Sequence, residues 1–119
     1  MSAFYESFTE EIDEYGCQFS SVLLKLSNAL MVFIFEKGGS MKLGTLAVAI
    51  PQFEGKTCVS SILLGERNIL ITKILAERVS TSYKGMALVS THLPEIYGAE
   101  SSSTLLKLTQ KILEKTGLK

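Results

Sequence analysis

Two short runs in the sequence are apolar at every position, residues 29–35 (ALMVFIF) and residues 46–50 (LAVAI). Successive side chains of a β-strand point to opposite faces of the sheet, so a strand with one solvated face alternates apolar and polar residues. Runs without that alternation predict a sheet with two apolar faces. Helices can cover one of those faces, and the other needs a separate cover.

The pattern around these runs predicts an α+β fold, with several antiparallel strands followed by a helix, a strand and a last helix. Ser27-Asn28 has the composition of a two-residue hairpin turn, and Lys37–Ser40 (KGGS) that of a second turn. The expected strands are residues 18–26, 29–36, 41–50, 57–64 and 86–93. We expect residues 1–119 to form one two-layer domain, a mainly antiparallel sheet with two helices packed on one face.

Apolar residues recur at helical spacing in the two segments predicted to be helices. The first follows Gly65, and its expected stripe consists of Ile71, Ile74, Leu75, Arg78 and Val79. The second begins at Ser101–Ser103, which offer N-caps, and is expected to bury Leu105, Leu108 and Ile112. Residues 4–15 fit two interpretations, because Phe4, Phe8, Ile12 and Tyr15 are close to helical spacing and an acidic edge strand is equally consistent.

Composition excludes several classes of function. Lys plus Arg and Asp plus Glu both number 12, so the chain has no basic excess for binding nucleic acid. The longest apolar run is far below the roughly 20 residues that a membrane helix needs, and no secretory signal opens the chain. We therefore expect no nucleic-acid or membrane partner, and a location in the cytoplasm or also in the nucleus.

No motif predicts catalysis or a bound cofactor. Gly65-Glu66-Arg67-Asn68 (GERN) lies between a strand and a helix but has one glycine, whereas phosphate-binding loops need several, so Gly65 is interpreted as a corner. His92 is the only histidine, and no G-x-S-x-G motif exists to place an activated serine near it. Cys17 and Cys58 are far apart and lack metal-ligand spacing. We expect no enzyme activity, no cofactor and no metal.

The turn lengths predict which side chains share a face of the sheet. Leu24 is then opposite Met31 and Val22 opposite Phe33, and a four-residue loop would place Val32 opposite Thr45. Two sets emerge. The bulky set is expected beneath the helices and comprises Val22, Leu24, Leu26, Met31, Phe33, Phe35, Leu46 and Val48. The mixed set comprises Ser21, Leu23, Lys25, Leu30, Val32, Ile34, Leu43, Thr45, Ala47 and Ala49. All of these except Ser21 and Ala49 form the hypothetical dimer interface.

The mixed set has the composition of a protein interface, apolar with a few polar members. Two covers are possible: a second protein chain, which we prefer, or the N-terminal segment folded back over the sheet. The dimer hypothesis predicts that Val32→Asp abolishes association without disturbing the core. A charge at Phe33 is predicted to unfold the protein.

The runs "LLKLSNALMVFIF", "LGTLAVAI", "VSSILLG", "LITKILAERVSTSYKG" and "ALVS" resemble the small eukaryotic proteasome assembly chaperones over roughly residues 17–92. The chain is most similar to the chaperone 4 family, with chaperone 3 as the neighbouring family. The resemblance implies a two-layer, non-enzymatic protein that acts early in assembly of the 20S α ring. It also implies α-type subunits, notably the fifth, and a chaperone 3-like subunit or a second copy as partners.

Two rival functions come from other classes of protein. A roadblock- or longin-like scaffold dimer for a small GTPase usually begins with a helix, which the spacing of Phe4, Phe8 and Ile12 permits. A small enzyme that uses Cys58 or His92 is the second rival. Affinity capture separates the first rival from a chaperone, and replacing Cys58 or His92 by alanine tests the second.

Overall fold

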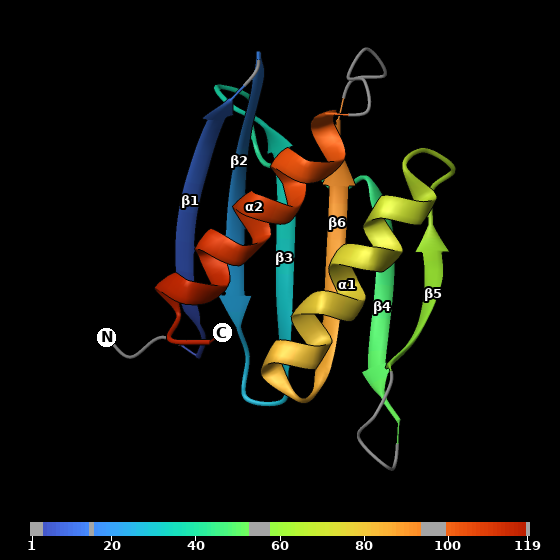
Figure 1. Ribbon diagram of the computed structural model, residues 1–119. Helices are drawn as coiled ribbons and strands as arrows, with labels where there is room; N and C mark the ends of the chain where they lie inside the picture. Colours follow the sequence, from blue (N-terminus) through green and yellow to red (C-terminus); the bar gives the residue numbers. More distant parts are fainter. Residues whose placement is uncertain (1–3, 15, 53–57, 94–99, 119) are drawn as a thin grey trace.

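The computed structural model describes residues 4–14, 16–52, 58–93 and 100–118. Along the chain the elements are β1 (Glu6–Glu14), β2 (Cys17–Lys25), β3 (Ala29–Glu36), β4 (Thr45–Pro51), β5 (Cys58–Leu64), α1 (Ile69–Tyr83), β6 (Met86–His92) and α2 (Glu100–Lys115). The strands form one sheet in the order β1-β2-β3-β6-β4-β5. Both helices lie across the same face of this sheet (Figure 1). The predicted α+β two-layer fold is confirmed.

The β2–β3 hairpin has the predicted register. Val22 is paired with Phe33 and Leu24 with Met31. The Leu26 N–H donates to the Ala29 carbonyl at 2.9 Å, which closes the turn at Ser27-Asn28. Hairpin register follows from turn length alone, so local sequence is sufficient to specify it.

The predicted pairing of residues 30–34 with residues 43–47 is wrong, because β6 lies between β3 and β4. β3 pairs with β6 in parallel, which places Val32 opposite Val89, and β4 pairs with the other side of β6 in antiparallel orientation. The chain does turn at the predicted Lys37–Ser40, where the Gly39 N–H donates to the Glu36 carbonyl at 3.0 Å, but the whole connection from β3 to β4 runs through residues 37–44. Neighbouring strands are about 4.8 Å apart, so this longer connection can cross the width of a strand and leave space for β6.

The N-terminal segment is an edge strand and not a helix. β1 pairs with β2 along its whole length, with Phe8 opposite Leu23 and Ile12 opposite Phe19. Side chains four residues apart lie on the same face in a strand and in a helix. The spacing of the apolar residues in this segment was therefore consistent with either structure. Because β1 extends the sheet, its residues do not cover either face of β2 and β3, contrary to the second cover considered above.

Each helix buries a stripe of side chains against the sheet. The stripe of α1 differs from the prediction: Thr72, Leu75, Ala76, Val79 and Ser80 are buried, whereas Ile74 is 40% exposed and Arg78 is also exposed. The stripe of α2 contains Leu105, Leu108 and Ile112, as predicted. Ser101–Ser103 lie inside the first turn of α2, which begins at Glu100, and so are not caps.

The core lies between the helices and the mixed set, so the predicted assignment of the two sheet faces is wrong. Leu23, Leu30, Val32, Ile34 and Ala47 are at most 1% exposed and belong to the same buried cluster as the helix side chains. The bulky set points away from the helices. Beneath α1, the small side chains Ala47, Ala49 and Ala87 of β4 and β6 leave space for the side chains of the helix.

Gly65 is the corner that the sequence predicted. Its φ is +94°, and a Cβ atom there would lie 2.5 Å from the Thr45 Oγ1 and 2.7 Å from the Thr45 Cα. The Thr45 hydroxyl donates to the Arg67 carbonyl, which fixes the entry to α1. A side chain at residue 65 would therefore meet both a disfavoured backbone conformation and the backbone of β4.

We expect Gly65→Ala to lower the free energy of unfolding by about 2–4 kcal/mol, because conformational strain and the clash with Thr45 combine. Gly38→Ala is the matched control. Gly38 also has a positive φ, +86°, but a Cβ atom at that residue would meet nothing within 4 Å. We expect the control to cost about 1 kcal/mol. Urea denaturation measures both, and equal losses would contradict the proposed clash.

Candidate protein-interaction face

The face of the sheet that carries no helix is apolar across its centre. We call this surface the open face and define it by Val22, Leu24, Met31, Phe33, Leu46, Val48 and Leu88, all partly exposed side chains from four adjacent strands. Along β6, Leu88 alternates with Ala87 and Val89, which are fully buried in the core beneath the helices. This alternation places Leu88 on the side away from the helices.

Strand register aligns these side chains into rows across the sheet. One row runs from Leu24 to Met31, Leu88 and Val48, through successive pairs of strands. The next contains Val22 and Phe33, followed by Ser90 and Leu46. Directly opposed side chains on neighbouring strands lie within contact distance. The first row is therefore a continuous apolar strip, and the second is apolar except at its serine.

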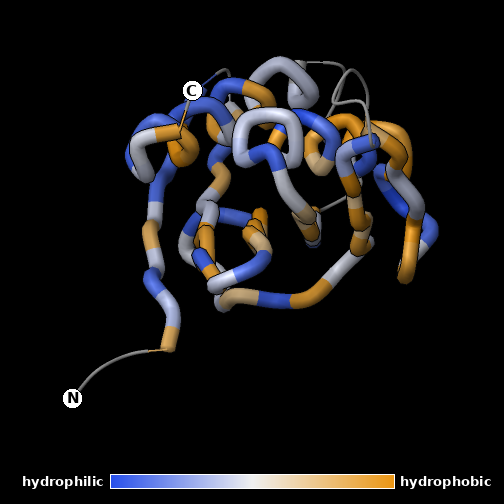
Figure 2. Tube along the Cα trace, turned by 90° about the horizontal axis from the view of Figure 1, so that it is seen from below, coloured by the Kyte–Doolittle hydropathy of each residue, from blue (hydrophilic) through white to orange (hydrophobic). Residues whose placement is uncertain are grey.

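Polar residues lie beside the open face on both edge strands, and most of them are on β1. β1 contributes Ser7, Thr9, Glu11 and Asp13 beside the apolar rows, and β5 contributes Ser61 opposite Val48. On the β5 side, Ile50 and Val59 are each 52% exposed and extend the apolar surface toward that edge. Figure 2 shows β1 largely hydrophilic as it leaves the N-terminus, with hydrophobic residues more frequent on the opposite side of the molecule. An apolar centre with polar residues along its β1 margin resembles the arrangement found in protein–protein interfaces.

Most residues predicted to form the dimer interface lie elsewhere. Leu23, Leu30, Val32, Ile34 and Ala47 are buried beneath the helices, and Thr45 is 5% exposed next to the corner at Gly65. Lys25, at the end of β2, is partly exposed. Leu43 is 55% exposed but precedes β4 and is not part of the sheet. The structure therefore brings together a different set of side chains on the uncovered face.

Sequence reasoning missed Leu88 of the open face, and also Ile50 and Val59, which extend its apolar surface toward β5. A signal for them was present in residue size. Along β4 the small residues Ala47 and Ala49 alternate with Leu46, Val48 and Ile50, and along β6 Ala87 alternates with Met86 and Leu88. Small residues mark the strand positions over which a helix packs closely, so the larger neighbours belong to the other face.

The structure contains no arrangement typical of catalysis among its described residues. His92 ends β6, is exposed, and borders a shallow hollow of about 340 Å³ with Gly44, Thr45 and Gly65. In the described parts of the chain, no three His, Cys, Asp or Glu side chains lie close enough together to hold a metal ion. Cys17 is buried near the β1–β2 turn, whereas the Cys58 thiol contacts the Thr81 hydroxyl at 3.2 Å between β5 and α1.

Neither of the two helices is long and apolar enough to cross a membrane; that finding covers the described residues. The apolar rows of the open face have the composition of surfaces through which proteins bind one another. The fold and the open face define the class of this protein: it is a two-layer α+β protein in which one apolar face of the sheet carries no helix.

No protein-family model matches the chain, and no curated protein does. Among solved structures, the chain is similar to one from the crystal structure of a novel chaperone complex for yeast 20S proteasome assembly. The TM-score is 0.65, and the match covers 96% of this chain and 93% of that chain. The two sequences are 15% identical, so the likeness shows a shared fold. That fold is the one implied by the sequence resemblance to small proteasome assembly chaperones.

Proposed function

We propose that this protein is a non-enzymatic chaperone for assembly of the 20S proteasome. The observation that carries the proposal is the fold: 96% of this chain matches a chain of a proteasome assembly chaperone complex. The sequence resemblance over residues 17–92 names the same class independently. The lack of a catalytic arrangement among the described residues is compatible with a protein that acts by binding.

The proposal includes two kinds of partner. The first is a related small chaperone subunit, or a second copy of this chain, docked on the open face. The apolar rows of the open face support it as the contact, because a protein interface is apolar at its centre. The second is an α-type proteasome subunit, notably the fifth, during early formation of the α ring in the cytoplasm or nucleus. The sequence resemblance supports this second partner.

The alternative function, a scaffold dimer for a small GTPase, is no longer supported by the observation that favoured it. That alternative depended on a helix at the start of the chain, and residues 6–14 form β1 instead. No other feature of the described residues favours it.

Affinity capture of the tagged protein from its native cell extract tests the proposed function. We expect free proteasome α-type subunits and a second small chaperone to co-purify, with few β subunits, because an early assembly factor leaves before the particle is complete. The ratio of α to β subunits, measured by quantitative mass spectrometry, is an internal control against capture of mature particles. Absence of α subunits under gentle conditions, or recovery of a GTPase complex, would contradict the proposal.

A further inference from the structure

Among the described strands, β1 lies at one of the two edges of the sheet, so its outer side pairs with no other described strand. An edge strand presents unpaired backbone N–H and C=O groups that can pair with a strand from another chain. The Ser21 hydroxyl donates to the Glu10 carbonyl at 3.4 Å, so this carbonyl points toward β2. Carbonyls of successive residues in a strand point in opposite directions, and those of Thr9 and Glu11 therefore point to the free edge.

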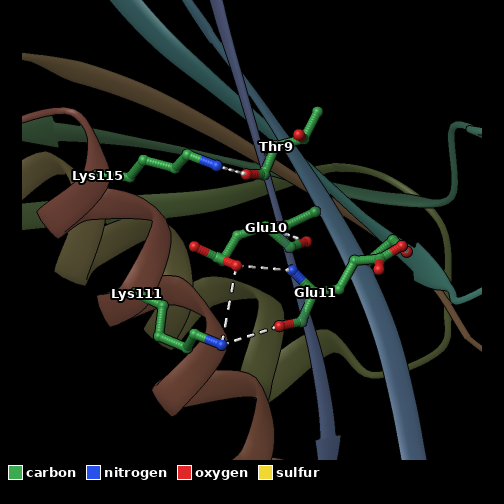
Figure 3. Close-up of polar contacts among 7 residues, drawn as sticks. Thr9, Glu10, Glu11, Lys111 and Lys115 are labelled. Atoms are coloured by element: carbon green, nitrogen blue, oxygen red, sulfur yellow. Dashed lines mark hydrogen bonds and ion pairs between the residues drawn. The ribbon is translucent and has the colours of Figure 1, made fainter.

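Side chains occupy both backbone groups of Glu11 at this edge. The Glu11 N–H donates to the Glu10 Oε1 at 3.2 Å, and the Lys111 Nζ donates to the Glu11 carbonyl at 3.0 Å. The Lys111 Nζ also lies 3.8 Å from the Glu10 Oε1, so the two side chains that contact the Glu11 backbone form an ion pair with each other. Figure 3 shows the three residues together, with Lys111 reaching from α2 to β1.

Two further lysines of α2 continue this arrangement along β1. The Lys115 Nζ donates to the Thr9 carbonyl at 2.7 Å, the next carbonyl on the free edge (Figure 3). The Lys107 Nζ pairs with the Glu14 Oε2 at 3.0 Å. Lys107, Lys111 and Lys115 are four residues apart and so lie on one side of α2. The row follows β1 over residues 9–14.

We propose that these lysines, together with Glu10, act as an edge guard that prevents another strand from pairing with β1. The ammonium groups of Lys111 and Lys115 donate to the outward carbonyls of Glu11 and Thr9, and the Glu10 carboxylate accepts from the Glu11 N–H. An added strand would need these same backbone groups. The inference does not depend on the proposed function, because it concerns which surface of the chain is closed to association.

The contacts of the guard are suited to specificity more than to stability. The side chains of Lys107 and Lys111 are 55% and 46% exposed, and exposed ion pairs contribute little to folding. Charged side chains at a sheet edge, and lysine above all, are a common means of blocking edge-to-edge association. Because the outward backbone groups of β1 are occupied, another chain can bind at the open face but is hindered from adding a strand to β1.

The test compares the double variant Lys111→Met, Lys115→Met with the unchanged chain in sedimentation velocity experiments over a range of protein concentrations. Methionine keeps most of the side-chain length and removes the donors and the charge. We expect the double variant to form larger assemblies at concentrations at least about tenfold below those at which the unchanged chain does. The control Lys42→Met, Lys73→Met removes the same charge from residues outside β1 and α2, and we expect it to sediment like the unchanged chain.

A third change identifies the edge itself. Proline at residue 11 removes the outward N–H and is tolerated on an edge strand. Adding Glu11→Pro to the double variant is expected to restore the original sedimentation. Unchanged size of the double variant, equal assembly of the control, or failure of the proline to reverse assembly would each overturn the proposal. Loss of the fold in the double variant would also overturn it, since the lysines would then be stabilising contacts and not a guard.

Discussion

Val32→Asp is expected to leave the chain largely unfolded at 25 °C. The Val32 side chain is 1% exposed in the middle of β3, beneath the helices, and belongs to the main buried cluster. A carboxylate at this position would lose its hydration and gain no partner. We expect the free energy of unfolding to fall by more than about 4 kcal/mol, which is comparable to the whole stability of many small domains.

Circular dichroism and one-dimensional NMR of the purified variant measure this effect. The nearly isosteric change Val32→Thr is the control for volume: it replaces one methyl group by a hydroxyl, introduces no charge, and is expected to destabilise the chain by a much smaller amount. This prediction reverses the expectation from sequence, in which Val32→Asp abolished association alone. A folded Val32→Asp protein with dispersed NMR signals would contradict the position of the core.

Leu88→Lys is expected to weaken association by at least about 100-fold while leaving the chain folded. Leu88 lies near the centre of the open face, in the row that joins Met31 to Val48. A lysine there can extend its charged end into water in the free protein, so the fold is largely spared. In a complex the same charge would be buried against an apolar partner. A 100-fold loss corresponds to about 2.7 kcal/mol, within the range of residues that dominate an interface.

Sedimentation equilibrium measures self-association of this variant, and titration calorimetry measures binding of a co-purified chaperone subunit. The matched control is Ser61→Lys, which places the same charge on the same face at β5, outside the apolar rows. We expect little change from the control. Equal association of Leu88→Lys and the unchanged chain would show that the open face is not the contact, and a similar loss with Ser61→Lys would point to a general charge effect.

Local sequence was sufficient wherever a contact depends on residues close in the chain. The turn at Ser27-Asn28 fixed the β2–β3 register, and the break at Gly65 marked the corner before α1. The apolar spacing of Leu105, Leu108 and Ile112 identified the buried side of α2. Turn length, backbone conformation and helical periodicity are all local properties, which explains why these predictions are confirmed.

The insertion of β6 between β3 and β4 could not be predicted in this way. β6 joins β3 by a pairing between residues 29–35 and 86–92, far apart in the sequence. Every residue of β3 from Ala29 to Phe35 is apolar, so its side chains are compatible with a central strand and with several neighbours. Composition therefore indicated that both faces of β3 are apolar without indicating which strands lie beside it.

The choice between the two sheet faces failed for a physical reason. The prediction assigned the larger side chains to the core, but the volume beneath a helix is limited by the helix's own side chains. Leu75 and Val79 of α1 fill that space, and the sheet contributes Ala47, Ala87 and Val89. Met31 and Phe33 remain on the face where no helix restricts their size.

The sequence by itself determined that this chain forms an α+β sheet protein with two apolar sheet faces and a balanced charge. It did so because alternation, turn chemistry and composition are properties of neighbouring residues. Only the tertiary structure decided the strand order, the face that the helices cover, and the contact of the α2 lysines with β1. Those features depend on how side chains from distant segments share a limited volume and satisfy backbone groups at an edge, and short-range patterns do not encode either.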